Sequence, residues 1–343
     1  MNVEAGEQLE ALLRDVLDAG DASGVAAAYG IGNEDRGMLL LGRRAHADDA
    51  APVTARTRWD LASLTKVLAT VPTVLQLVDE RRLRLDMPVS DVLPQVGSLA
   101  GGEATIAQLL SHQGGFAPEP PRHAGSMLEA VLAAEQVPPG HAVVYSDVGY
   151  LALAVAIERI EGAPLDHVFA RRVVDALGLQ DTTFGHAPCT ATASTGVACE
   201  GDVVLAHDPT AQALGTCGHA GMFASLNDVI AMAKRWIAPD GWMAAPTVRR
   251  AFQTQTTGLP GGRRGLGWSL EGDPFHCAPT GWDPGAASHS GYTGTSVTVS
   301  RATRAWAVLL TNCLPRGGDA GPIIRLRRSF HQLVAASLSE EIG

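Results

Sequence analysis

The sequence predicts an α+β fold in which one discontinuous domain, built from both ends of the chain, encloses an inserted, mainly helical domain. Strand-like segments lie near both ends of the 343 residues, and helical patterns dominate the region between them. We place the first domain at residues 1–60 plus 255–343 and the second at residues 61–254.

The first part of the chain predicts an amphipathic helix and two short strands. Leucine and valine residues recur at helical spacing within the first 20 positions, and strand-like runs follow at 25–29 and 38–41. A second helix begins near Ser63. Pro72 lies within its apolar pattern and predicts a kink or a less regular helix there.

The middle of the chain predicts helices separated by Gly- and Pro-rich loops. These helices are expected at 106–110, 127–134, 148–160, 165–177 and 227–237. Asn227 is the expected N-cap of the last one. Strands are predicted at 295–300 and 305–311, and a final amphipathic helix at 323–338.

The composition is that of an ordinary globular protein, with 46% apolar and 18% charged residues and a formal net charge of −10. An acidic chain without a basic stripe binds phosphate backbones and anionic lipids poorly, so we expect neither a nucleic acid nor a membrane as partner. The first 20 residues lack the basic and apolar regions of a signal peptide, and no apolar stretch is long enough to span a bilayer. These observations predict a cytoplasmic protein.

The cysteines are five in number, scattered, and without a CxxC pair. Such a set is typical of reduced, mostly packed thiols rather than of a disulfide framework or a metal site. We therefore expect reduced thiols, no metal and no cofactor. The cysteines are Cys189, Cys199, Cys217, Cys277 and Cys313.

Ser63 and Lys66 form the first positive signal, an S-x-x-K pair at the start of a helix. The GxSxG, HExxH, P-loop and strand-linked GxGxxG motifs are absent. An i, i+3 spacing places the hydroxyl and the amine on one helical face, where partial burial can lower the lysine pKa until the neutral amine accepts a proton. Only Lys66 and Lys234 are lysines beside 24 arginines, and arginine cannot be deprotonated. The structural alternative is a helix-capping serine beside a solvated lysine.

Two further motifs carry polar side chains suited to catalysis. Tyr145 and Asp147 precede the helix predicted at 148–160. A tyrosine phenolate beside a lysine ammonium can act as a general base. The structural alternatives are a core aromatic for Tyr145 and a helix N-cap for Asp147. His289-Ser290-Gly291-Tyr292 precedes a strand. Its glycine permits close approach of a substrate, and a following N–H can help to bind an oxyanion; a hairpin turn with a surface histidine is the alternative.

The ordered set of motifs resembles the serine β-lactamase and penicillin-binding-protein superfamily, specifically its class C-like branch of esterases, transacylases and D-aminopeptidases. The similar stretches are WDLASLTK at 59–66, LLSHQGG at 109–115, PPG at 138–140, YSDVGY at 145–150, LGLQDTTF at 177–184, GHAGMF at 218–223 and HSG at 289–291. The resemblance covers about residues 20 to 315. It implies an antiparallel sheet flanked by helices, a helical domain, and an active site in the cleft between them.

The resemblance also implies residue roles. Ser63 would be the acylated nucleophile, Lys66 would assist its activation, and Tyr145 would take up and return its proton. The N–H groups of Ser63 and Tyr292 would bind the oxyanion. Asp147 stands where β-lactamases usually carry asparagine. The resemblance assigns no cofactor.

His289 is the second departure, because it replaces a lysine that helps to bind the carboxylate of a β-lactam. A less cationic pocket favours the esterase side of the branch. His219 is expected to pack a loop. Five apolar residues are candidates for the lining of an acyl pocket, and membership of the hydrophobic core is the alternative for each. They are Cys217, Met222, Phe223, Trp268 and Trp282.

The function expected first is hydrolysis of a small ester, or of an amide, through an acyl-Ser63 enzyme. A transacylase that passes the acyl group to an amine or alcohol acceptor uses the same intermediate. A β-lactamase or D-aminopeptidase and a non-catalytic binding protein on the same fold are the remaining possibilities.

Overall fold

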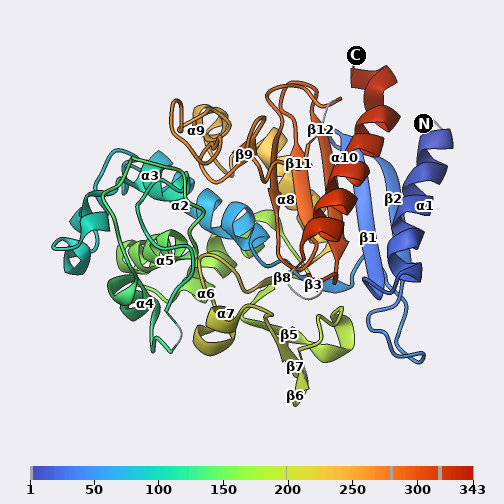
Figure 1. The fold of residues 1–343 in the computed structure, drawn as a ribbon, viewed down its shortest axis with the longest axis horizontal. Helices are drawn as coiled ribbons and strands as arrows, with labels where there is room; N and C mark the ends of the chain where they lie inside the picture. The colour runs from blue at the N-terminus through green and yellow to red at the C-terminus, as the bar shows by residue number, and fades with distance from the viewer. Residues whose placement is uncertain (1–2, 122, 198, 279–280, 316–318, 343) are drawn as a thin grey trace.

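A six-stranded antiparallel sheet forms the centre of the computed structural model, which describes residues 3–121, 123–197, 199–278, 281–315 and 319–342 (Figure 1). The strand order is β2-β1-β12-β11-β10-β9. The strands are β1 (Gly24–Ile31), β2 (Glu34–Gly42), β9 (Ser269–Leu270), β10 (Ala287–Ser290), β11 (Ser296–Val299) and β12 (Ala305–Thr311). Strands from both ends of the chain thus share one sheet, and the predicted α+β fold with helices flanking an antiparallel sheet is confirmed.

Helices cover both faces of this sheet, so that every residue of β12 is buried. On one face, α1 (Val3–Asp18) and α10 (Gly321–Ile342) lie side by side (Figure 1). On the other face, α8 (Leu226–Ile237) packs against β1, β11 and β12. Alternate residues of β1 enter the two cores, with Ala27 on the α1 side and Ala28 on the α8 side.

The middle of the chain supplies most of the remaining helices. They are α2 (Val71–Asp79), α3 (Ile106–Leu110), α4 (Met127–Ala133), α5 (Asp147–Glu161), α6 (Leu165–Phe169), α7 (Pro209–Leu214) and α9 (Ala245–Ala251). Residues 148–157 of α5 are all buried, which makes α5 the central helix of this region. No described helix is both long and apolar enough to cross a lipid bilayer.

Two small three-stranded sheets draw five of their six strands from the region predicted to be mainly helical, residues 61–254. The first has the order β3 (Arg58–Asp60), β8 (Met222–Ser225), β4 (Thr183–Phe184), and the second β5 (His186–Pro188), β7 (Val203–Leu205), β6 (Cys199–Glu200). Strands of two to four residues are too short to show the alternation that predicts a strand. The domain boundaries at 60/61 and 254/255 stay a prediction.

Pro72 has the predicted effect on the helix that carries Lys66. Residues Lys66–Thr70 form a π-helical turn directly before α2, because a proline inside a helix removes one N–H donor from the regular ladder. The predicted N-cap at Asn227 is wrong. Ser225 caps α8 instead, and its hydroxyl accepts the Asp228 N–H.

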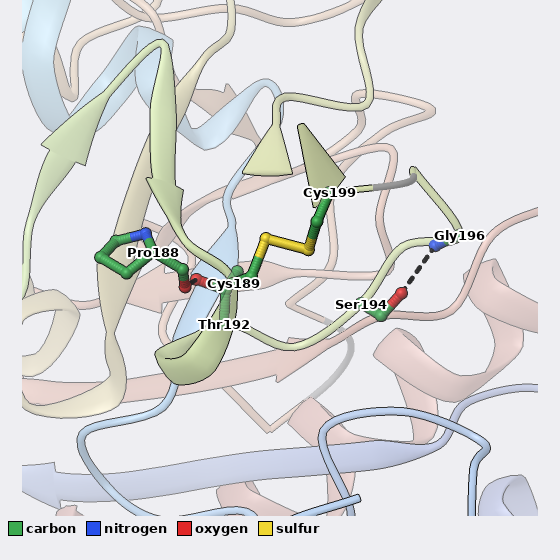
Figure 2. The surroundings of a disulfide bond; sticks show 6 residues. All are labelled: Pro188, Cys189, Thr192, Ser194, Gly196 and Cys199. Atoms are coloured by element: carbon green, nitrogen blue, oxygen red, sulfur yellow. Dashed lines mark hydrogen bonds between the residues drawn. A yellow bond between two sulfur atoms is a disulfide. The ribbon is translucent and has the colours of Figure 1, made fainter. Parts of the chain in front are cut away.

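The cysteine prediction is also wrong for one pair. Cys189 and Cys199 form a disulfide that joins the end of β5 to the start of β6 (Figure 2). Their Cα atoms are 6.2 Å apart, within the usual range for a disulfide. The sequence contains no short cysteine motif that predicts this pair. The other cysteines, Cys217, Cys277 and Cys313, are buried and free. The disulfide removes the cysteine argument for a reducing compartment, and the cytoplasmic location stays a prediction.

Candidate active site

Ser63 lies in the turn between β3 and the helix that carries Lys66. Ala62 precedes it with a φ of +46°, a left-handed conformation that is strained for a residue with a Cβ. The Ala62 N–H donates to the Asp60 carboxylate at 2.9 Å. This buried carboxylate therefore holds the turn that presents the Ser63 hydroxyl.

The end of β10, an inner strand of the central sheet, approaches this turn at Gly291. A Cβ at Gly291 would lie 2.3 Å from the Leu61 carbonyl oxygen and from Thr295 Oγ1, so a larger residue does not fit. The hydroxyls of Thr293 and Thr295 donate to the carbonyls of Asp60 and Leu61, at 2.6 and 3.2 Å. The sequence predicts that the absence of a side chain at Gly291 allows a substrate to approach the backbone. In the structure, the group that lies close to Gly291 is the backbone carbonyl of Leu61, just before Ser63.

Lys66 is fully buried, so the solvated-lysine alternative is wrong. Its ammonium donates to Ser63 Oγ at 3.0 Å, to Asp147 Oδ1 at 2.6 Å and to the His219 carbonyl at 3.1 Å. Burial lowers the pKa of Lys66, but attraction to Asp147 and Tyr145 outweighs burial and raises that pKa above the ordinary lysine value. The sequence left the charge of Lys66 open, and these contacts favour the cation at neutral pH.

Asp147 is not the N-cap of α5. That position belongs to Ser146, whose hydroxyl accepts the Gly149 N–H at 3.1 Å. Because Ser146 satisfies the helix end, the Asp147 carboxylate is left to pair with Lys66.

Tyr145 is half-buried, with its ring centroid 4.9 Å from Lys66 Nζ. The ring packs on His112 at a centroid distance of 4.4 Å, on Phe275 at 5.8 Å and on His289 at 6.3 Å. These contacts hold the Tyr145 ring beside the Lys66 ammonium.

His289 is buried, so the surface-histidine alternative is wrong. Its Nδ1–H donates to the Ser290 carbonyl at 3.0 Å, and its Nε2 has no hydrogen-bond partner in the described part of the chain. Burial, followed by the positive charges of Arg264 and Lys66, holds the pKa of His289 well below its ordinary value. The imidazole is neutral at pH 7.

A pocket of about 210 Å³ brings Ser63 together with most of the predicted residues. Lys66 reaches Ser63 from the protein interior. Neither the Ser63 nor the Tyr292 N–H has an acceptor among the described residues, which leaves both groups free to bind an oxyanion. The predicted residues that line this pocket are Ser63, Tyr145, His289, Ser290, Gly291 and Tyr292.

Three residues of the site were missed from the sequence. His112 packs on Tyr145, and its Nδ1 accepts the Ser146 N–H at 3.1 Å; its signal was the LLSHQGG stretch. Arg264 and Arg327 line the pocket but lie outside every recognised motif. The argument from His289, which predicts a less cationic pocket than that of a typical penicillin site, did not include these two arginines.

Asp147, Asp208 and His219 are the described residues that could hold a metal, since their ligand atoms lie within 4.8 Å of one another. The Lys66 ammonium already bonds Asp147 there. Asp208 caps α7, and its Oδ1 lies 3.1 Å from His219 Nε2. The His219 side chain therefore packs a loop, as expected, and its backbone carbonyl accepts a hydrogen bond from Lys66.

The apolar residues considered for an acyl pocket belong to the hydrophobic cores instead. All are buried, and they do not line the pocket beside Ser63. They are Cys217, Met222, Phe223, Trp268 and Trp282.

Comparison with known proteins agrees with the fold described above. A model of the beta-lactamase family matches residues 9–332. The chain belongs to the beta-lactamase family.

Among curated proteins, this beta-lactamase-family chain is similar to a putative D-alanyl-D-alanine carboxypeptidase of Escherichia coli K12. The two are 27% identical over 331 residues, covering 83% of this chain and 74% of the relative. The relative from Salmonella typhimurium, with the same description, is 26% identical.

Solved structures with the same fold include EstCE1 and simvastatin synthase. EstCE1, described as a hydrolase with promiscuous acyltransferase activity, has a TM-score of 0.77 at 20% identity and covers 95% of this chain and 98% of its own. Simvastatin synthase from Aspergillus terreus has a TM-score of 0.78 at 18% identity, with 97% and 98% covered. The family supports an enzyme of the general kind of a beta-lactamase-fold serine hydrolase.

Proposed function

We propose that this protein is a serine hydrolase that cleaves a small carboxylic ester through an acyl-Ser63 intermediate. The observation that carries the proposal is the 3.0 Å contact between Lys66 Nζ and Ser63 Oγ at the edge of a pocket. A nucleophilic hydroxyl needs a nearby proton acceptor and a fixed direction of approach, and this site offers both.

Tyr145 is the proton acceptor in this mechanism. The Lys66 ammonium stabilises the phenolate, which takes the Ser63 proton as Oγ attacks the ester carbonyl. The N–H groups of Ser63 and Tyr292 bind the oxyanion. Tyr145 then gives the proton to the departing alkoxide, and the same steps with water release the acid and restore Ser63.

The first test is the intact mass of the protein after brief exposure to 4-nitrophenyl acetate. We expect an acetyl adduct that is present in the wild type and absent in Ser63→Ala, together with loss of ester turnover in the variant. Ser288→Ala is a matched control, because Ser288 is buried and does not line the pocket. Full turnover in Ser63→Ala would overturn the proposal.

Transacylation is the second candidate, and the apolar rim of the pocket favours it. Phe275, Tyr292 and Ile324 are among the most exposed large apolar residues and all line this pocket. An apolar acceptor bound there would compete with water for the acyl group. Amide or ester product formed from added amines or alcohols measures this partition, and acid alone would count against transfer.

A β-lactamase, a D-aminopeptidase and a non-catalytic binding protein each have a direct test. Rapid turnover of a chromogenic cephalosporin would favour a β-lactamase, and release of D-alanine from a peptide amide would favour a D-aminopeptidase. The absence of both an adduct and released acid would favour a binding protein. Cytoplasmic location is part of the proposal, and so is a small-molecule partner.

A further inference from the structure

We propose that a second pocket, separate from the Ser63 site, binds the phosphate group of a small molecule through Arg44, Arg56 and Arg58. This pocket has a volume of about 390 Å³ and lies between the segment 51–58, which leads into β3, and the turn at 190–191. Such a volume takes a phosphate together with a small organic body. No described residue lines both pockets, so the site does not depend on the proposed ester chemistry.

The lining of this second pocket is positive, in a chain whose formal net charge is −10. Arg44, Arg56 and Arg58 share it with one acid, Asp181, so three positive charges against one negative charge leave an excess of two. Asp228 lies behind Asp181 and does not line the pocket; its carboxylate accepts two backbone N–H groups and one hydroxyl. An excess of two charges matches a dianion.

Two of the guanidinium groups already converge on one oxyanion. Arg56 donates from Nε and Nη2 to the two carboxylate oxygens of Asp181, at 3.0 and 2.9 Å. Arg58 Nη2 lies 3.4 Å from the same carboxylate. A phosphate monoester carries close to two negative charges at neutral pH and has three terminal oxygens, which suit guanidinium groups that approach from several directions.

Arg58 and Arg44 have donors to spare. The Arg58 side chain is only 16% exposed, yet no described residue accepts a hydrogen bond from its guanidinium, and Asp181 is the described acid within ion-pair distance of it. Its Nε is buried without a partner. No described acid lies within ion-pair distance of Arg44. Guanidinium N–H groups in a half-buried pocket are costly to leave without an acceptor, and a bound phosphate supplies several.

The backbone of both arginines is fixed before any ligand binds. The Arg44 carbonyl accepts the Ser194 N–H at 2.7 Å, and the Arg58 carbonyl accepts the Ala193 N–H at 2.8 Å. Ser194 and Ala193 belong to the loop at 189–199 that the disulfide closes (Figure 2). Because this loop holds the two arginines in place, binding a ligand between them orders little further chain.

Isothermal titration calorimetry of the purified full-length protein tests the inference, at neutral pH and constant ionic strength. The probes are inorganic phosphate, glycerol phosphate and acetate, with chloride as the balancing salt. We expect both phosphates to bind, and acetate to bind at least about 10-fold more weakly, because it offers one charge and two oxygens. No heat of binding for either phosphate overturns the inference, and so does acetate that binds as tightly as phosphate.

Charge-removing variants connect the binding to this pocket. Arg44→Gln and Arg58→Gln are each expected to raise the Kd for phosphate about 10- to 100-fold, the range for hydrogen bonds to a charged group. Arg43→Gln is the matched control, since Arg43 is the exposed chain neighbour of Arg44 and does not line the pocket. A Kd that stays at the wild-type value in both pocket variants overturns the inference.

Asp181→Asn provides a change in the opposite direction. Its carboxylate competes with phosphate for Arg56 and Arg58, so the variant should bind phosphate about 10-fold more tightly, a gain that loss of fold cannot mimic. Weaker binding in an Asp181→Asn protein that unfolds at the wild-type temperature contradicts the assignment. Phosphate bound beside Ser63 instead would inhibit ester turnover competitively, and inhibition that persists unchanged in Arg58→Gln also overturns it.

Discussion

Lys66 Nζ and Asp147 Oδ1 are 2.6 Å apart, in an ion pair whose lysine is completely buried. The pair joins the helix after β3 to the first turn of α5, across 81 positions of sequence. Its consequence is electrostatic: attraction to Asp147 raises the pKa of Lys66, so the lysine beside Ser63 stays charged and does not accept the Ser63 proton itself.

Asp147→Asn is expected to reduce kcat/KM for a neutral ester about 10- to 100-fold, as loss of a charge-assisted hydrogen bond does. The pKa of Lys66 is raised in the native protein, so its charge is lost only as pH rises through that raised value. Removing the carboxylate lowers this pKa, and the alkaline limb of the pH–rate profile should move to lower pH. Asp166→Asn, at an exposed position, is the control; an unmoved limb in Asp147→Asn would contradict the prediction.

Gly291→Ala is expected to lower both stability and activity. Its Cβ would meet the Leu61 carbonyl at 2.3 Å and push the serine turn away from the end of β10, an overpacking cost of about 1–3 kcal/mol. Gly6→Ala is the contrasting variant, because a Cβ there meets nothing within 4 Å and alanine favours the helix. Thermal unfolding and ester turnover of both variants check the prediction, which fails if Gly291→Ala unfolds like the wild type.

The pair of Asp208 and His219 is expected to make stability depend on pH. Burial alone would raise the pKa of Asp208, but the hydrogen bond and attraction to His219 lower it to about 2. A depressed carboxyl pKa stabilises the fold above the ordinary value of 3.8, and this stability disappears as pH falls through about 2. The contribution at neutral pH is about 2 kcal/mol.

Urea unfolding of the wild type and Asp208→Asn between pH 7 and pH 2 measures this contribution. Asparagine keeps the helix cap of α7, so the comparison isolates the charge. The difference in unfolding free energy should shrink as the solution is acidified. A difference that is constant over this range would show that the carboxylate charge does not contribute.

The Cys189–Cys199 disulfide is expected to add about 3 kcal/mol to stability, the chain-entropy value for a loop of this length. Thiol titration in denaturant should find three free thiols, rising to five after reduction, since Cys217, Cys277 and Cys313 are free. The Cys189→Ser/Cys199→Ser variant should unfold at lower denaturant concentration and keep Ser63-dependent turnover. Five free thiols before reduction would contradict the pairing.

Sequence reasoning predicts the fold class and the residues that meet at Ser63, because ordered short motifs carry both kinds of information. It does not predict the charge state of Lys66, since that depends on a partner 81 residues away and on burial. Arg264 and Arg327 were missed for a related reason. In a chain with 24 arginines, nothing local to the sequence distinguishes a buried guanidinium from a solvated one.

Short strands and the disulfide escaped prediction because both depend on chain segments that meet only after folding. Cys189 and Cys199 are brought together by the small sheet of β5, β7 and β6, whose strands have only two or three residues. Pro72, by contrast, changes the hydrogen bonding of the helical turn directly before it, and the less regular helix there was predicted correctly.

The hydrogen bonds from Thr293 and Thr295 to the turn before Ser63 mean that this turn is completed late in synthesis. Thr293 and Thr295 bond the carbonyls of Asp60 and Leu61, yet the ribosome adds these threonines more than 230 residues later. β1 likewise cannot pair with β12, its neighbour in the sheet, until the central region and β12 have been translated. A nascent chain therefore exposes Ser63 and Lys66 long before the wall of their pocket exists, and the pocket is complete only after translation has passed Arg327.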